Sequence, residues 1–391
     1  MKYLVFNAGS SSLKVAVLDS ADCGIVASAA ADWAGQATHY DFISPEAKIS
    51  QAVEWRDPAS AVARSLADLR RACPECFSGA DAVVAVGHRV VHGGDFSEAM
   101  LVTPHVREQL GELVGLAPLH NPPSLAALDQ ALELLPEARH IVCFDTSFHQ
   151  TKLAAARRYA VPREWSDRYR IRRYGFHGLS YAYNTRRAGE MLGADKRLVI
   201  CHLGHGCSAC AVRDGRCVDT TMGFTPLEGL MMATRSGSID AEAIFHLQRE
   251  HGLTPDEICN QLNRHSGLLG VSETSADMRE VLSASRSGDQ RARLAVDMYC
   301  HRVRQAIGAL AVTLGGVDAL VFTAGVGEHS AEIRAAVCRG LDCLGLHLDL
   351  AANQSCRADQ DIATSDSAAR ILVIHTREEL SMLNMLSDFR D

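Results

Sequence analysis

Short apolar runs alternate with polar, glycine-containing segments along most of the chain. The runs at residues 4–6 and 15–18 enclose the turn sequence NAGSSSLK and predict the two strands of a hairpin. Five further runs predict buried strands, at residues 82–86, 141–144, 198–202, 319–323 and 371–374. Three longer stretches predict helices, at residues 58–73, 121–135 and 289–314. This alternation of strands and helices favours an α/β fold.

The first hairpin has an echo about half a chain later. LVFNAGSSSLKVAVLD near the N-terminus and LVICHLGHGCSACAVRDG from residue 198 each read as strand, glycine-containing turn, strand. The repetition predicts two related halves, each offering a phosphate-binding turn to a shared cleft; chance similarity of two hairpins is the alternative. A domain boundary is expected near residues 148–152. No Gly/Ser-rich or Pro-rich linker is present, so the halves are expected to be joined closely.

Composition narrows the class of protein. The chain has 391 residues, 47% of them hydrophobic and 22% charged, as in a soluble globular protein of two or three domains. The formal net charge of −8 argues against broad binding of nucleic acid or of anionic membranes. No apolar stretch approaches the length of a membrane span, and a strand expected from residue 3 leaves no room for a signal peptide. We therefore expect a cytoplasmic protein without a nucleic-acid or membrane partner.

Thirteen cysteines are scattered without framework spacing, which fits a reducing compartment. Two CxxC pairs occur, at residues 73–76 and 207–210. A shared zinc site would require the two pairs to converge, and no supporting His or Cys spacing is present. We expect these residues to be buried or incidental thiols.

Several polar side chains stand next to predicted strands in the first half. In GHRVVHGGD, Arg89 follows the run 82–86 and offers either a donor fork for an anion or a surface salt bridge. In VCFDTSFHQT, Asp145 ends a buried strand, where a carboxylate can bind a metal, orient a phosphate or serve structure alone. In APLHNPPS, His120 lies at a rigid proline corner, as a structural or a functional residue.

The second half has comparable candidates. RRYGFHGLSY places His177 between glycines before a predicted helix, and HLGHGCS forms the second glycine turn. Arg235 lies in TMGFTPLEGLMMATRSGSID. FTAGVGEHS puts two glycines between a buried strand and a helix expected from residue 331, which suits backbone approach to a nucleotide.

Two carboxylates, Glu378 and Glu379, follow the strand predicted at residues 371–374. By themselves they read as solvated acids at a helix start. The opening turn adds Asn7, three serines and Lys14, which suit contact with a polyanion or a metal–phosphate; a plain polar hairpin loop is the alternative.

Taken together, NAGSSSLK, GHRVVHGG, LHNPP, FDTSFH, YGFHG, GFTPLEGL, TRSG and the Gly-Val-Gly stretch resemble the acetate kinase family, in this order over nearly the whole chain. The resemblance implies two related α/β domains of the actin-like ATPase (ribonuclease H-like) type around a central cleft. These would span residues 1–148, with 379–391 as a candidate addition, and residues 149–378, which carry the nucleotide site. It further implies reversible phosphoryl transfer from ATP to acetate with Mg²⁺ (or Mn²⁺), cleft closure and a homodimer.

The resemblance also assigns roles by motif. The catalytic group comprises Arg89, His120, Asp145, His177 and Arg235. Substrate would lie against Arg89 and an acyl pocket of Val91, Leu119, Phe176 and Pro226. Phosphates and nucleotide would contact Ser10, Ser12, Lys14, His202, Leu203, Gly204, His205, Gly206, Asp277, Met278, Arg279, Gly325, Val326 and Gly327. Asn7 and Glu378 would hold the metal ion.

This chain departs from the family pattern on the nucleotide side. His205 and His329 stand where many members have asparagine, and Ser238 and Ala241 replace an aspartate and a proline. ATP affinity and the choice of phosphate donor therefore stay open. A propionate or other short-chain acyl kinase is one alternative, and a nucleotide-binding sensor without acyl transfer is another.

Overall fold

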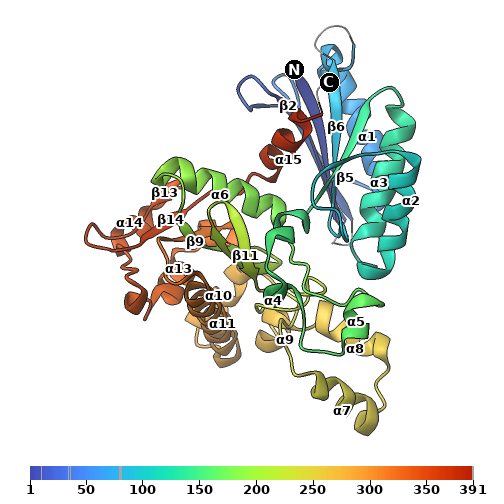
Figure 1. Ribbon diagram of the computed structural model, residues 1–391. Coiled ribbons are helices and arrows are strands. Elements are labelled where there is room, and N and C mark those ends of the chain that lie inside the picture. Colours follow the sequence, from blue (N-terminus) through green and yellow to red (C-terminus); the bar gives the residue numbers. More distant parts are fainter. Residues whose placement is uncertain (10, 34, 36, 79–81, 390–391) are drawn as a thin grey trace. The chain divides into compact units, whose positions relative to one another are not determined.

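The computed structural model describes residues 1–9, 11–33, 35, 37–78 and 82–389. The chain divides into two compact units (Figure 1). Unit 1 comprises Met1–Phe148 and Arg377–Asp391, and unit 2 comprises His149–Thr376. Each unit is built on its own β-sheet.

Unit 1 places an eight-stranded sheet between helices. Its elements are β1 (Lys2–Ala8), β2 (Ser12–Asp19), β3 (Ile25–Asp32), β4 (Thr38–Ile43), β5 (Lys48–Val53), α1 (Pro58–Ala72), β6 (Val83–Val90), β7 (Met100–Leu101), α2 (Pro104–Glu112), α3 (Asn121–Leu134), β8 (Arg139–Phe144) and α15 (Glu378–Ser387). The strand order is β5-β4-β3-β2-β1-β6-β8-β7. The two faces of β6 show how the sheet is covered: Val86 joins the core beneath α1 and α3, whereas Gly87 faces Met382 and Leu386 of α15.

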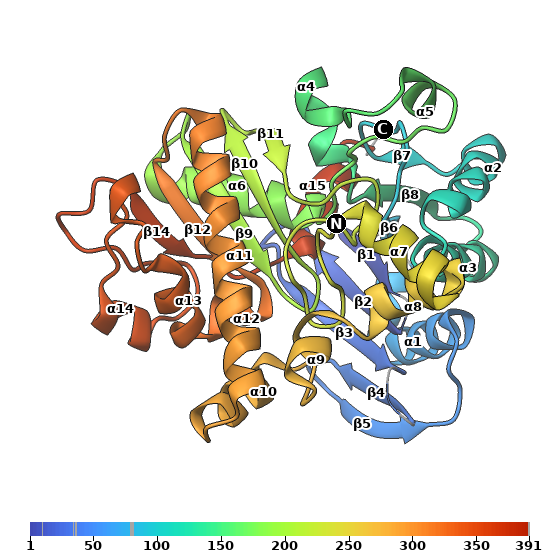
Figure 2. The same cartoon turned by 90° about the horizontal axis from the view of Figure 1, so that it is seen from below.

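Unit 2 has a six-stranded sheet with α6 and α11 packed against it (Figure 2). Its elements are α4 (Ala154–Arg157), α5 (Arg163–Asp167), α6 (Gly178–Leu192), β9 (Arg197–Leu203), β10 (Cys207–Arg213), β11 (Arg216–Thr220), α7 (Ala241–His251), α8 (Pro255–Arg264), α9 (Gly267–Ser272), α10 (Met278–Arg286), α11 (Gln290–Leu314), β12 (Ala319–Thr323), α12 (Ala324–His329), α13 (Ala331–Cys338), α14 (Leu350–Ser355), β13 (Gln360–Asp361) and β14 (Arg370–Val373).

The two sheets share one topology. Unit 2 has the order β11-β10-β9-β12-β14-β13, and six strands of unit 1 have the corresponding order β3-β2-β1-β6-β8-β7. In each sheet the first three strands are antiparallel, the next two run parallel to the hairpin's first strand, and the sixth is antiparallel again. β4 and β5 extend the sheet of unit 1 alone. The echo between the hairpins is therefore one part of a repeated sheet.

Every predicted strand and helix is confirmed, with small shifts at the ends. One local prediction is wrong. Arg89 does not follow a strand but lies within β6, because that strand pairs with β8 as far as Val90. The glycines at 325 and 327 lie between β12 and α13, as predicted, and are part of the short helix α12.

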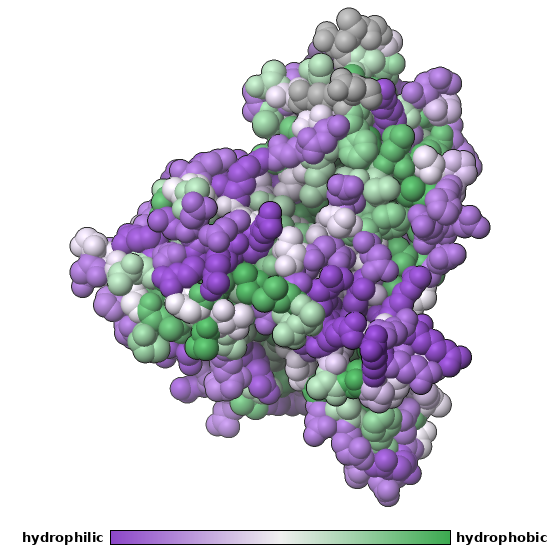
Figure 3. All heavy atoms as spheres, viewed as in Figure 1, coloured by the Kyte–Doolittle hydropathy of each residue, from purple (hydrophilic) through white to green (hydrophobic). Residues whose placement is uncertain are grey.

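On the face drawn in Figure 3, hydrophilic side chains predominate and apolar ones form separate patches among them. Over the part of the chain that the structure describes, no helix combines the length and the apolar character needed to cross a membrane.

Candidate active site

Arg89 is the centre of a polar cluster in unit 1. Its Nε donates to Oδ1 of Asp145 at 2.8 Å and its Nη2 to Oδ2 at 2.7 Å, a bidentate ion pair. Its Nη1 donates to Oδ1 of Asn7 at 2.9 Å and lies 3.2 Å from Oε2 of Glu378. The amide of Asn7 in turn donates to the same Oε2 at 3.0 Å. Four predicted site residues from β1, β6, the end of β8 and the start of α15 thus form one network.

The network is largely shielded from solvent. Asp145 is 1% exposed, Arg89 17% and Glu378 14%. Burial opposes the charge of Arg89, but Asp145 and Glu378 outweigh it and raise the pKa of the guanidinium. The expectation of a surface salt bridge at Arg89 is therefore wrong, and so is that of a solvated acid at Glu378. That carboxylate does begin a helix, but it is largely buried and ion-paired.

His120 is the residue before α3, at the proline corner. Its neighbour Asn121 is fully buried and exchanges two hydrogen bonds with the backbone of His92, at 3.1 and 3.0 Å. This exchange ties the segment after β6 to the start of α3. His120 thereby gains a defined place in the unit that carries Arg89.

The first hairpin forms as predicted, with Asn7 opposite Lys14 in the register of β1 and β2. Both residues line a groove of about 230 Å³ in unit 1, together with Glu379. The turn is closed by a hydrogen bond from the Gly9 amide to the carbonyl of Ser12 at 2.8 Å. The predicted phosphate contact Ser10 lies outside the described residues.

His177 occupies a constrained position in unit 2. It precedes α6 with φ +59°, a left-handed conformation that is uncommon for a residue with a Cβ. Its Nδ1 lies 2.9 Å from Oγ of Ser208, and that hydroxyl lies 2.5 Å from the hydroxyl of Tyr181. Its ring stacks on His202 with centroids 4.1 Å apart. His202 itself is held by the Ser180 hydroxyl at 2.8 Å.

The side chains of His177 and Arg235 both lie next to Gly206. A Cβ at this glycine would lie 2.9 Å from Nη2 of Arg235 and 3.3 Å from Nε2 of His177. The absence of a side chain in the second glycine turn therefore leaves room for both donors. Arg235 also donates from Nη1 to the carbonyl of Pro226 at 2.7 Å.

The surroundings of Arg235 contain little compensating charge. Among the residues that the structure describes, no carboxylate forms an ion pair with its guanidinium. Burial lowers its pKa from the ordinary value. Burial, followed by the charge of Arg235, also lowers the pKa of His205, which favours the neutral imidazole.

A cavity of about 1440 Å³ lies in unit 2, larger than most small-molecule pockets. It collects half of the residues predicted for phosphates and nucleotide: Gly204, His205, Asp277, Met278, Arg279, Gly325 and Val326. His329, one of the departures from the family pattern, also lines it. Within the described chain, His202, Leu203, Gly206 and Gly327 are not part of its lining. His202 instead supports His177, and Leu203 is fully buried.

Arg334, which the sequence did not point to, organises one wall of this cavity. It is 2% exposed, and its Nη1 donates to the carbonyls of Gly327 and Glu328 at 2.9 and 2.7 Å. Its Nε and Nη2 donate to Asn353 at 2.8 and 2.9 Å. The guanidinium thus satisfies carbonyls at the end of α12, where the helix dipole favours a cation.

The four predicted acyl-pocket residues divide between the units. Val91 and Leu119 belong to unit 1, and Phe176 and Pro226 to unit 2. Phe176 and Pro226 are buried, Val91 is half-buried and Leu119 is exposed.

Sequence reasoning missed the partners that fix the candidates. Ser208 and Tyr181 hold His177, and both lie in motifs quoted for other reasons, HLGHGCS and YGFHGLSY. The four CxxC cysteines are buried, as predicted.

Two sheets of one topology, each opening with a hairpin turn, define an α/β protein of the actin-like ATPase fold group. The sequence model of the acetokinase family matches residues 2–384, and the chain belongs to this family of kinase enzymes. A protein of Nostoc punctiforme named acetate kinase is 44% identical over 393 residues, and one of Syntrophomonas wolfei is 43% identical over 387; each comparison covers 97% of both chains.

Solved structures agree with this assignment. Acetate kinase of Porphyromonas gingivalis matches with a TM-score of 0.90 at 36% identity over 99% of each chain. A propionate kinase of Francisella tularensis matches with a TM-score of 0.91 at 36% identity over 98% of each chain.

Proposed function

We propose that this chain catalyses the reversible transfer of a phosphoryl group from ATP to acetate, giving acetyl phosphate and ADP. The observation that carries the proposal is the family match over residues 2–384, with relatives named acetate kinase at 43–44% identity. The two polar clusters support it, because they contain the arginines and histidines that this chemistry needs. We further propose that the enzyme is cytoplasmic and forms a homodimer.

The chemistry demands charge stabilisation more than a base. A carboxylate is already a nucleophile at neutral pH, so the barrier lies in bringing an anion to a polyanion and aligning the two. Asp145 occupies the Nε–Nη2 edge of Arg89, so the acyl carboxylate would meet the Nη1–Nη2 edge and share Nη1 with Asn7 and Glu378. Arg235, half-buried and without an ion-pair partner among the described residues, would stabilise the phosphoryl group in flight.

His177 would donate a hydrogen bond to the same phosphoryl group. The Tyr181 hydroxyl can donate to Ser208, and Ser208 can then donate to Nδ1 of His177. That arrangement leaves the proton on Nε2, the ring nitrogen that faces the Gly206 position beside Arg235. We assign His120 a supporting role near Arg89.

The family implies ATP and a divalent metal ion, and we propose Mg²⁺, with Mn²⁺ as a substitute. Asn7 and Glu378 offer amide and carboxylate oxygens within one cluster, the ligand types that hard cations prefer, so the residues present fit such an ion. The bound ion would neutralise phosphate charge. Arg89 would share Glu378 with the ion, and its ion pair at 3.2 Å limits how far that carboxylate can turn away.

The acceptor has a second candidate. Because the propionate kinase of Francisella tularensis is as similar in structure as the acetate kinase of Porphyromonas gingivalis, a propionate kinase is the alternative. Val91, Leu119, Phe176 and Pro226 are proposed to set this choice. One methylene is worth only about 1–3 kcal/mol in an apolar pocket, so both acids can react at different rates.

A panel of short carboxylates tests the proposal. Purified protein receives ATP, Mg²⁺ and formate, acetate, propionate or butyrate, and the acyl phosphate is trapped as a hydroxamate. We expect the highest kcat/KM for acetate, with acetyl phosphate and ADP driving the reverse reaction. Higher efficiency with propionate would favour the second candidate. Binding of ATP without transfer to any acid would replace both with a nucleotide-binding sensor.

A further inference from the structure

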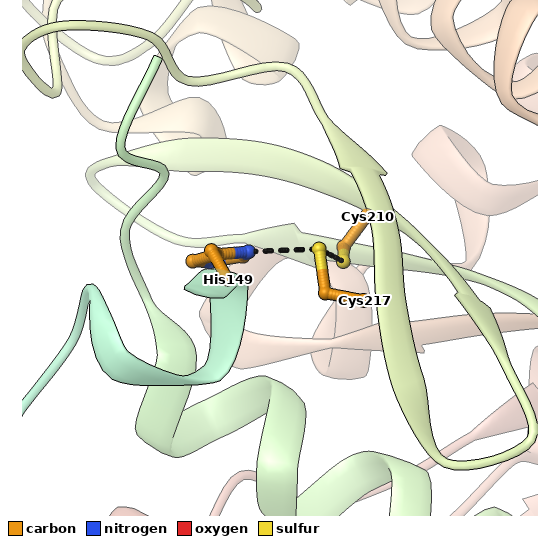
Figure 4. Close-up of side chains that lie close together, drawn as sticks. All are labelled: His149, Cys210 and Cys217. Carbon is orange, nitrogen blue, oxygen red and sulfur yellow. Dashed lines mark hydrogen bonds between the residues drawn. The ribbon is translucent and has the colours of Figure 1, made fainter. Parts of the chain in front are cut away.

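Three buried side chains of unit 2 that have no assigned role in the reaction lie together: His149, Cys210 and Cys217 (Figure 4). Cys210 and Cys217 belong to the paired strands β10 and β11, and His149 belongs to the 3-10 helix Ser147–Thr151. Nδ1 of His149 lies 3.1 Å from Sγ of Cys217, which lies 3.5 Å from Sγ of Cys210. One ligand atom from each residue lies within 4.8 Å of the other two.

We propose that His149, Cys210 and Cys217 form a binding site for a thiophilic divalent cation of the Zn²⁺ kind. In a tetrahedral zinc site with bonds of about 2.3 Å to sulfur and about 2.1 Å to nitrogen, neighbouring ligand atoms are about 3.6–3.8 Å apart. The separations of 3.1 Å from Nδ1 to Sγ of Cys217 and of 3.5 Å between the two sulfurs need to widen by about half an ångström or less. Nδ1 and Sγ of Cys210, which lie within 4.8 Å of each other, need to come to about 3.6 Å. Two thiolates and one imidazole leave the fourth position to a solvent molecule.

The imidazole is oriented for this role. Its Nε2 lies 2.9 Å from the carbonyl oxygen of Phe176, which can only accept a hydrogen bond. Nε2 therefore carries the proton, and Nδ1 presents its lone pair to the sulfurs. A backbone carbonyl on the remote ring nitrogen is the usual way in which proteins orient a metal-binding histidine.

Local charge also permits a cation. The Lys152 ammonium is buried nearby and donates to the carbonyls of Arg173 and Tyr174 at 3.1 and 3.0 Å. Its single positive charge is outweighed by two thiolates once both cysteines bind a metal ion. β11 is the edge strand of its sheet, so local opening of that strand gives an ion a way in.

The site lies directly behind the segment that carries His177. A Cβ at Gly175 would lie 2.6 Å from the His149 ring. The Phe176 carbonyl accepts a hydrogen bond from Nε2 of the same ring. A cation bound to Nδ1 would therefore hold the imidazole and, through it, the backbone at residues 175–176.

Cadmium titration of the whole chain tests the proposal. The reference is the triple variant C23S/C259S/C343S, which removes three exposed thiols. It is reduced, stripped with chelator and titrated with Cd²⁺, and sulfur-to-cadmium charge-transfer absorption is followed. We expect one tight Cd²⁺ per chain, displaced by Zn²⁺, and a higher Tm with Zn²⁺.

Further variants in that background locate the ion. Adding Cys217→Ser or, independently, Cys210→Ser is expected to weaken Cd²⁺ binding at least a hundredfold. His149→Gln, which keeps an N–H donor for Phe176, is expected to weaken it about tenfold to a hundredfold. Cys76→Ser is the matched control, because Cys76 is also buried but lies in unit 1. Circular dichroism checks folding. Unchanged binding in both the Cys210 and Cys217 variants, or no tight site in the reference, would overturn the proposal.

Discussion

Arg89 and Arg235 carry the same guanidinium group in opposite electrostatic surroundings. Arg89 lies among Asp145, Glu378 and Asn7, and the two carboxylates raise its pKa. Arg235 donates to the carbonyl of Pro226, and burial lowers its pKa. In the described part of the chain, Arg89 forms ion pairs with carboxylates and Arg235 forms none.

The difference separates two uses of one side chain. A cation already neutralised by two carboxylates gains little from a further anion, but it fixes the strands and the helix that supply its partners. A partly buried cation without a counter-charge has lost some of its hydration and gains more from an arriving anion, so it favours anion binding. We infer that Arg89 chiefly organises unit 1, whereas Arg235 supplies most of the charge that stabilises the transferring phosphoryl group.

Removing Arg89 is expected to have the largest effect on stability. Arg89→Leu leaves Asp145, only 1% exposed, and Glu378 without their cation. Breaking a buried ion pair from one side typically costs about 3–5 kcal/mol, and we expect a loss of this size in the free energy of unfolding. Urea unfolding at neutral pH measures it. The double variant Arg89→Leu/Asp145→Asn should recover part of the loss, because the amide is uncharged. A single variant as stable as the parent would contradict the proposed organising role.

Removing Arg235 should lower activity far more than stability, the opposite of what is expected at Arg89. Arg235→Ala takes away a donor aimed at developing charge, and we expect kcat to fall by a factor of about 100 to 1,000. The free energy of unfolding should change little, since Arg235 is half-buried and forms no ion pair with a described residue, so its removal leaves no carboxylate without a partner. Steady-state kinetics and urea unfolding on the same preparation test both halves. Arg235→Lys keeps the charge and should retain more activity than the alanine variant. Destabilisation as large as that at Arg89 would remove the contrast.

The same two residues show what sequence could and could not predict. Strands buried on both faces leave uninterrupted apolar runs, so β1, β6, β8, β9 and β12 could be located from sequence. The sequence predicts that Arg89 lies outside β6, because a pattern of apolar residues carries no information about the hydrogen bonds that β6 forms with β1 and β8.

Residue roles were harder, because they depend on contacts across the sequence. The pairing of Arg89 with Glu378 joins β6 to the start of the C-terminal helix, and no local pattern connects them. The family resemblance brought Arg89, Asp145, Asn7 and Glu378 onto one list, but it did not reveal that they bond to one another. Ser208 and Tyr181 illustrate the same limit: their hydroxyls matter only once α6 and β10 are packed together.

A pair of histidines beside Arg89 should make unit 1 sensitive to acid. Nε2 of His88 lies 2.9 Å from Nδ1 of His140, whose Nε2 donates to the Leu135 carbonyl at 2.9 Å. Burial, followed by the charge of His140, lowers the pKa of His88, and burial lowers that of His140. The unfolded chain, with histidine pKa values near 6.5, therefore binds more protons as pH falls through that value.

The contribution of this pair to the free energy of unfolding should hence be flat above about pH 7 and fall below about pH 6.5, by about 2 kcal/mol in total near pH 5.5. Urea midpoints measured across this range report the slope. The double variant His88→Gln/His140→Gln should flatten it, whereas His251→Gln, on the exposed end of α7, should leave it unchanged. An identical slope in the double variant would assign the acid sensitivity to other groups.

The smallest effects are expected at Ser208 and Tyr181, which act on the reaction only through His177. Ser208→Ala removes the hydroxyl 2.9 Å from Nδ1, so the ring no longer has a fixed tautomer with its proton on Nε2. The loss of one hydrogen bond of this kind should lower kcat about tenfold, with little change in the KM for acetate. Tyr181→Phe should cost less, because Ser208 can still donate to the ring. A positioning role also predicts a shifted acidic limb in the pH profile of kcat for Ser208→Ala, since a ring released from its partner titrates differently. A fall in kcat without that shift would mean that Ser208 supports packing alone, and His177 would then be oriented chiefly by its stacking on His202.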